Sequence, residues 1–254
     1  MAAMALRDVL SAMWRVDPEW RPAFCLIPGG KTNLAAHDVG CVPHGADGLR
    51  RVFEAAGRNQ MRHHRITRTV MDITRPDVSA DPVCGMFLGA GAFSQATELS
   101  RNEANAMGLY HGLAVGWTIA SMVVRNMRGK PGGSVPMKMD ADGVNVLDSD
   151  QFILIATTVH RIIMGLLPFW GAGGGAIRYT AIAGPPKSLA RAIWPLLRGH
   201  PRPWMQAAGY RSGRADKLTL RLSSPFTVDG ELFDPGPSGL VEVSARRTFD
   251  FVHP

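Results

Sequence analysis

Cysteine, acidic charge and long apolar runs are all scarce in this chain of 254 residues. The cysteines (Cys25, Cys41 and Cys84) are odd in number and far apart, which excludes a disulfide framework and a paired-cysteine metal site. We therefore expect a reducing, cytoplasmic compartment. The longest apolar stretch, residues 109–124, contains His111 and is shorter than the ~20 residues that a membrane-spanning helix needs. The first residues lack the pattern of a secretory signal, so a soluble protein is predicted.

Basic residues outnumber acidic ones, 28 against 21, which gives a formal net charge of +7. Such an excess suits nucleic acid, an anionic membrane surface or a phosphate-bearing substrate. The densest basic run, residues 58–68, has no aromatic side chains between its basic ones, so we expect no nucleic-acid partner. Two interpretations of this run stay open: a solvated edge strand, or a patch that faces an anion or a membrane.

The first 75 residues combine helix and strand signals in the way typical of an α/β unit. Leu6, Leu10 and Met13 follow one another at helical spacing, which predicts a first helix. The apolar run AFCLI (23–27) predicts a strand buried on both faces. A further helix is predicted over 46–56.

From about residue 66 the sequence consists mainly of short alternating stretches separated by turn signals, a pattern typical of a sandwich or barrel. The clearest are ITRTVMDI, MKMDADGVNVL, QFILIATTV, IRYTAIA, KLTLRLSS and VEVSARRTFDFV. Two helices are expected to interrupt them, over 95–126 and 188–197, with Pro195 kinking or ending the second. The predicted class is α+β: a partial α/β domain over 1–75, then a larger β-sandwich domain with helices over 76–254.

A glycine turn follows the predicted strand 23–27 and reads Pro28-Gly29-Gly30-Lys31-Thr32-Asn33. A Walker P-loop is excluded, because the first glycine that it requires falls on Cys25. Glycines ahead of a helix still allow backbone N–H groups to face a phosphate, and the three polar side chains would add donors. The alternative is a connector that binds nothing.

A second candidate motif lies late in the chain, at Val228-Asp229-Gly230-Glu231. Asp-Gly between strand-like stretches is a strong hairpin signal, so an ordinary turn is one interpretation. The other makes Glu231 a carboxylate base for a substrate hydroxyl.

Taken in order, these motifs resemble the diacylglycerol kinase catalytic family, which includes sphingosine kinases and bacterial lipid kinases. The matching segments are PGGKTNLAAHDVG (28–40), VMDI (70–73), FLGAGA (87–92), LRGH (197–200) and VDGE (228–231). The resemblance covers nearly the whole chain, and the ordered set is more specific than any one motif.

The resemblance implies a phosphofructokinase-like N-terminal domain, a β-sandwich domain and an active site in the cleft between them. It implies transfer of the γ-phosphoryl group of ATP, with Mg²⁺, to a lipid hydroxyl, a reaction in which positioning and charge neutralisation dominate. Matched by position, Glu231 would be the base, Asp229 would support it and Asp72 would help to order the magnesium. The nucleotide would be bound by Gly29, Gly30, Lys31, Thr32 and Asn33.

The chain departs from the family pattern at several points. The GGDGT loop of the family would fall on residues 1–5, which contain neither glycine nor aspartate. Lys31 stands where Thr or Ser is usual, Leu34 stands where Asp often follows the asparagine, and a turn that often carries metal ligands reads GAGGG (171–175). We therefore expect an N-terminally truncated chain that is inactive as it stands. Such a chain would be poorly soluble, form a homo-oligomer or be complemented by another polypeptide.

Two functions from different classes stay open. One is an ATP-dependent lipid kinase that acts on diacylglycerol or a sphingoid-like lipid alcohol, with peripheral contact at the inner face of the membrane. The other is a non-catalytic β-sandwich remnant that binds lipid or a protein partner.

Overall fold

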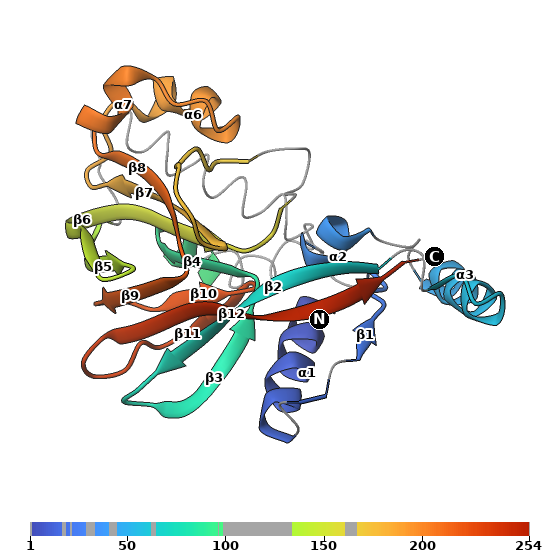
Figure 1. Ribbon diagram of the computed structural model, residues 1–254. Helices are drawn as coiled ribbons and strands as arrows, with labels where there is room; N and C mark the ends of the chain where they lie inside the picture. Colours follow the sequence, from blue (N-terminus) through green and yellow to red (C-terminus); the bar gives the residue numbers. More distant parts are fainter. Residues whose placement is uncertain are drawn as a thin grey trace.

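A computed structural model gives the fold, and it describes residues 2–16, 19–20, 22–28, 34–40, 45–61, 65–95, 97–98, 134–160 and 167–253. The helices whose bounds are given are α1 (Ala2–Val16), α2 (Leu34–Val39), α3 (Gly45–Gly57), α6 (Leu189–Leu197) and α7 (Pro203–Ala207). The strands are β1 (Ala23–Phe24), β2 (Arg65–Arg75), β3 (Ser79–Gly85), β4 (Phe87–Gly91), β5 (Val135–Ala141), β6 (Val144–Thr157), β7 (Ile177–Ala183), β8 (Tyr210–Ala215), β9 (Lys217–Leu222), β10 (Phe226–Val228), β11 (Glu231–Phe233) and β12 (Leu240–Val252). In Figure 1, α1, α2 and α3 lie at one end of the molecule, and α6 and α7 lie near the other.

The described strands form one curled, 12-stranded sheet. Its main path runs β11-β10-β4-β6-β5-β9-β12-β2-β3, while β7 joins β6, β8 joins β7, and β1 joins β12. The β1–β12 pairing is parallel, and the other described pairings are antiparallel. Antiparallel neighbours can be linked by short turns, which matches the frequent turn signals of the sequence.

Strand β12 links the curled sheet to the N-terminal segments. It pairs with β9 over Leu240–Ser244 and with β1 at Asp250 and Phe251, and it pairs with β2 on both sides of a bulge between Ser244 and Arg247. A bulge bends a strand and increases its twist. The first half of β12 therefore belongs to the curled sheet, and its last residues pair with the N-terminal strand β1 (Figure 1).

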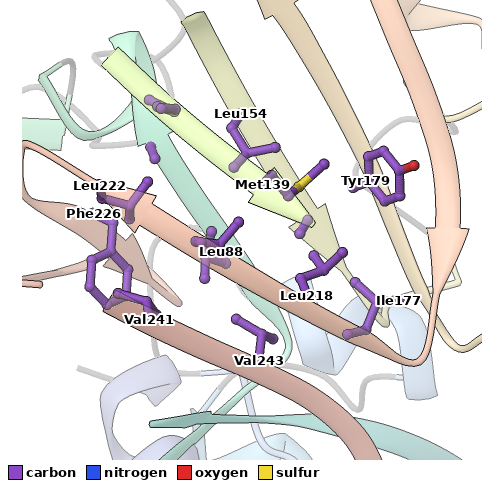
Figure 2. Close-up of a cluster of buried hydrophobic side chains, with 14 of the residues drawn as sticks. Leu88, Met139, Leu154, Ile177, Tyr179, Leu218, Leu222, Phe226, Val241 and Val243 are labelled. Carbon is purple, nitrogen blue, oxygen red and sulfur yellow. The ribbon is translucent and has the colours of Figure 1, made fainter. Parts of the chain in front are cut away.

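The largest hydrophobic cluster is built from alternate residues that the strands direct to one face of the curled sheet. Figure 2 shows Leu88, Leu154, Tyr179, Leu218 and Val243 in this cluster, each from a different strand and each buried. Because side chains alternate along a strand, the residues between these positions face the other way.

Two smaller clusters fix the helices to the sheet. Leu10 and Met13 of α1 pack with Val70 and Phe251, from β2 and β12. Beneath α6 and α7, the buried residues Leu189, Ala192 and Met205 pack with Ile182 and Tyr210 of β7 and β8.

The α+β class predicted from the sequence is confirmed. The apolar stripe Leu6–Leu10–Met13 becomes α1, and the helix predicted over 46–56 is α3. Pro195 lies inside α6, which continues to Leu197. The division of the chain after residue 75 stays a prediction.

One predicted strand was largely wrong. Residues 23–27 were expected to form a strand buried on both faces, but only Ala23 and Phe24 are in a strand, and Ala23 is exposed. The reason is topological: in the described part of the chain, β1 has β12 as its one neighbour, so it lies at an edge. The predicted helix over 95–126 lies almost entirely outside the described residues.

Candidate functional site

The VDGE motif forms the tight hairpin between β10 and β11. Val228 pairs with Glu231, and the two residues between them, Asp229 and Gly230, have φ angles of 49° and 88°. A two-residue turn with two positive φ angles is the kind that Asp-Gly favours. The hairpin interpretation of this motif is therefore confirmed, and it fixes where Glu231 lies.

Asp229 attaches this hairpin to the β3–β4 junction. The residue is partly exposed at the turn, but its carboxylate is buried and accepts hydrogen bonds from the backbone N–H groups of Phe87 (2.9 Å) and Met86 (3.2 Å). Burial raises the pKa of Asp229 to about 6, although these hydrogen bonds act in the opposite direction. Asp229 is therefore a positioning residue for the turn.

Glycine at position 85 is required by this close approach. A Cβ atom there would lie 2.3 Å from a methyl carbon of Val228 and 3.2 Å from the carboxylate of Asp229. A side chain would push the hairpin off β3. Gly85 thus belongs to the same structural unit as the VDGE turn, although it lies outside the motif.

Glu231 forms an ion pair with Arg7 of α1. The side chain of Glu231 is 22% exposed and that of Arg7 only 8%. Arg7 also donates from Nε to Asp8 at 3.0 Å, and its guanidinium lies 5.3 Å from the ring centre of Phe233. Burial alone would lower the pKa of Arg7, but Asp8 and Glu231 together raise it.

Asp72 of β2 forms a second ion pair, with Arg247 of β12. Arg247 donates to both carboxylate oxygens, from Nε at 2.8 Å and from Nη2. The same Nη2 lies 3.1 Å from the sulfur of Cys84, whose pKa is raised to about 11, chiefly by burial. Arg247 directly follows the β12 bulge, so backbone geometry places its guanidinium beside Asp72.

The sheet brings the three predicted acids into one region beside α1. Asp72 pairs in register with Cys84, and the next residue, Gly85, contacts the VDGE hairpin. Ser11 of α1 accepts a hydrogen bond from the N–H of Cys84 at 2.9 Å. One turn earlier in α1 lies Arg7, the partner of Glu231.

The sequence did not point to Arg7 and Arg247. Arg7 is separated from Glu231 by 224 positions, and no local pattern links them. Arg247 is one of two consecutive arginines in a strand-like stretch, and only the bulge decides which of them faces Asp72. The predicted nucleotide-binding residues Gly29, Gly30, Lys31, Thr32 and Asn33 lie outside the described residues, directly before α2.

The described residues around Asp72 do not fit a magnesium site as they are arranged. Both oxygens of this carboxylate accept from Arg247, whereas Mg²⁺ requires oxygen ligands in near-octahedral geometry. Across the described part of the chain, no three His, Cys, Asp or Glu residues gather closely enough to hold a metal.

A groove of about 550 Å³ lies elsewhere, where the β5–β6 hairpin faces the loop after β11. Its lining includes Asp148, Arg221 and Pro235 and does not include the three predicted acids. We therefore place the candidate site at the VDGE hairpin and not at this groove. Among the described residues, no helix has the length and apolarity needed to cross a bilayer.

Comparison by sequence finds no matching family model and no matching curated protein. Comparison by structure finds a crystal structure named as a "putative diacylglycerol kinase" from Bacillus anthracis str. Sterne, with a TM-score of 0.60 and 13% identity over 98% of this chain and 74% of that one. A second, named as a diacylglycerol kinase of the same strain, has a TM-score of 0.54 and 11% identity over 97% of this chain and 72% of that one. At such low identity the likeness concerns the fold: this chain has a kinase-like fold of the diacylglycerol kinase type.

Proposed function

We propose that the chain is an ATP-dependent lipid kinase of the diacylglycerol kinase type, with Glu231 as its base. The observation that supports this most is the docked hairpin. Asp229 ties the turn to Met86 and Phe87, and Glu231 is held beside a buried arginine. The pair places a carboxylate that can accept a proton next to a cation that can neutralise a phosphoryl group.

In the proposed step, a carboxylate oxygen of Glu231 takes the proton of a lipid hydroxyl. The hydroxyl oxygen forms a bond to the γ-phosphorus of ATP, and the bond from that phosphorus to the bridging oxygen breaks, which leaves ADP. Glu231 then returns the proton to water. Once Glu231 is protonated, Arg7 keeps Asp8 as a partner, but its Nη1 is released from the Glu231 carboxylate and can bind the transferred phosphoryl group, since guanidinium and phosphate match in geometry.

The nucleotide would bind through Gly29–Asn33, ahead of α2. Mg²⁺ would bind to the phosphates and neutralise their charge. Asp72 remains the proposed acidic partner of this ion, but it would first have to separate from Arg247. No step of the proposed transfer depends on that separation.

A second candidate function is supported by the same two ion pairs. In the structure, both Glu231 and Asp72 are already neutralised by arginines. A chain that keeps these pairs closed would be an inactive lipid-binding or partner-binding module.

One assay separates the two candidates. The purified chain is incubated with mixed micelles of diacylglycerol or sphingosine, radiolabelled ATP and Mg²⁺, and the lipid product is resolved. The kinase proposal expects labelled lipid from the native chain. It expects the rate of labelling to fall at least 100-fold in Glu231→Gln, because a general base contributes ~10²–10⁴-fold to a rate. The control is Glu242→Gln, the same change at a partly exposed residue of β12 that is paired with Lys217. Absence of labelled lipid from the folded native chain would agree with the inactivity expected from the missing GGDGT loop and would favour the inactive module.

For a lipid substrate, we propose that the face carrying α6 and α7 contacts the membrane. Residues 151–215 contain eight Lys and Arg and no Asp or Glu. On α6, Trp194 is 60% exposed, with the guanidinium of Arg198 at 4.1 Å from its ring centre. Aromatic rings and cations together suit the boundary of an anionic, cytoplasm-facing membrane.

Vesicle sedimentation tests this contact. The chain should sediment with vesicles of phosphatidylcholine and phosphatidylglycerol, less with phosphatidylcholine alone, and severalfold less after Trp194→Ala. Trp20→Ala is the control, because Trp20 is similarly exposed (57%) but lies in the N-terminal part of the chain. Equal sedimentation of the two variants would exclude α6 as the contact.

A further inference from the structure

Two arginines lie directly opposite each other on neighbouring strands. Arg178 of β7 pairs in register with Arg214 of β8. Like charges in this position destabilise a sheet. Figure 2 shows the neighbours Ile177 and Tyr179 in the main hydrophobic cluster, so Arg178 faces the other side of the sheet.

These arginines are poorly compensated. Arg178 is only partly exposed, and among the described residues it makes neither a hydrogen bond nor an ion pair. Arg214 donates from Nε to the carbonyl oxygen of Gly175 at 3.0 Å, a neutral partner. Burial lowers the pKa of Arg178 and the charge of Arg214 lowers it further, whereas the charge of Asp38 acts in the opposite direction.

Two more basic residues lie nearby, around one buried acid. Asp38 of α2 has a side chain with 0% exposure, and it accepts from Nε of Arg68 at 2.6 Å and from the backbone N–H of His160 at 2.9 Å. The pKa of His160 is lowered by burial first, and then by the charges of Arg68, Arg178 and Arg214, while the charge of Asp38 opposes this shift. Arg68 thus binds this carboxylate directly, and the charge of Asp38 also acts on Arg178 and His160.

The strand order connects this group to the candidate site through one row of paired residues that crosses neighbouring strands. Arg178 pairs with Thr157 of β6, which pairs with Phe87 of β4, whose N–H binds Asp229. Three strand spacings separate β10 from β7, or roughly 14 Å at about 4.8 Å each.

We propose that Arg178 and Arg214, backed by His160 and Arg68, form a binding site for a phosphate group. A guanidinium presents paired N–H donors that match phosphate oxygens, and a dianion placed between two arginines would remove their mutual repulsion. The site needs no catalysis, so it does not depend on the proposed kinase function. The phosphate group comes either from a phosphorylated lipid or from a soluble phosphate such as that of a nucleotide.

Titration calorimetry with two probes tests the site and distinguishes these sources. One probe is inorganic pyrophosphate, and the other is a short-chain phosphatidic acid kept below its micelle concentration. The variant is Arg178→Gln/Arg214→Gln, and the control is Arg221→Gln on β9, an exposed arginine outside this group. Because the double substitution removes a repulsion, it should fold at least as stably as the native chain, which thermal unfolding checks.

We expect the native chain and the control to bind at least one probe, and the double variant to bind it at least tenfold more weakly. Pyrophosphate binding identifies a soluble phosphate, while binding of phosphatidic acid alone identifies a lipid headgroup. The His160 imidazole provides a second readout by NMR, since a bound anion favours its charged form and raises its pKa. No binding of either probe, or equal binding by the double variant, overturns the proposal.

Discussion

The carboxylate of Asp229 is buried beneath the turn that it belongs to, and the direction of its pKa shift has a consequence for stability. Its pKa in the folded chain is about 6, above its ordinary value of 3.8. Above pH 6 the folded chain keeps a buried charge that the unfolded chain keeps in water. As the pH falls from 6 toward 3.8, the folded chain takes up a proton that the unfolded chain does not, so the contribution of this residue to stability rises.

We therefore predict a pH-dependent difference between the native chain and Asp229→Asn. About two pKa units correspond to roughly 3 kcal/mol. Between pH 7 and pH 4, the free energy of unfolding of the native chain should improve by about this amount relative to the variant, which cannot titrate at this position. Urea denaturation of both proteins across this range measures the difference. Parallel pH profiles would show that the carboxylate is not buried as described.

The pair Asp72–Arg247 gives a second prediction at the residue scale. The two side chains are 15% and 11% exposed, so removal of one partner leaves a largely buried charge. Asp72→Leu and Arg247→Met should each lower the free energy of unfolding by about 3–5 kcal/mol, whereas the double variant should lose much less than their sum. A double-mutant cycle in urea measures this coupling. Additive losses would mean that the pair contributes nothing as a pair.

At the scale of elements, a serine hydroxyl links α1 to β3, in addition to the Arg7–Glu231 ion pair and to packing. Ser11 accepts from the N–H of Cys84 and donates to the carbonyl oxygen of Arg7 at 2.7 Å. We predict that Ser11→Ala lowers the free energy of unfolding by about 1–3 kcal/mol, because it leaves a buried N–H without a partner.

Ser94→Ala is a suitable control for this change. Ser94 is also buried, but its hydroxyl donates to the carbonyl oxygen of Gly91, three residues earlier. Its removal leaves no donor unsatisfied, so the loss in urea denaturation should be clearly smaller. Equal losses would show that the bond between helix and strand is unimportant.

Local signals predicted most elements, because the information lies within a few residues. The Asp-Gly pair at 229–230 indicated a hairpin, and the Asp-Gly pair at 142–143 forms one as well; both turns have two positive φ angles. The stripe Leu6–Leu10–Met13 predicted α1. These features depend on backbone sterics and periodicity, and both can be read from the sequence.

The partners of the candidate site could not be predicted in this way. Arg7 meets Glu231 only because α1 packs on β3, and Arg247 meets Asp72 only because β12 has a bulge. The strand predicted over 23–27 was too long and too buried, because the burial of a strand depends on neighbouring strands that these five residues do not specify. Contacts between distant segments follow from topology, which short sequence windows do not encode.

At the scale of the whole molecule, β2 and β12 are shared by the N-terminal helices and the curled sheet. We predict that these parts unfold together. Val70 and Phe251 belong to the cluster beneath α1, whereas Leu220 and Val243 belong to the main cluster of the curled sheet. In native-state hydrogen exchange, the amides of both pairs should open with the same free energy. A clearly lower value for the first two would instead support independent domains that divide after residue 75.

The position of β12 also bears on how the protein is made. A ribosome adds residues from the N-terminus at about 5–20 per second, and β12, residues 240–252, emerges after the strands that it must join. Until then β9, β2 and β1 lack a neighbour, and open strand edges invite pairing with other chains. The sheet therefore cannot be completed before β12 has emerged, and we expect the yield of the protein in cells to depend on chaperones that protect these edges until then.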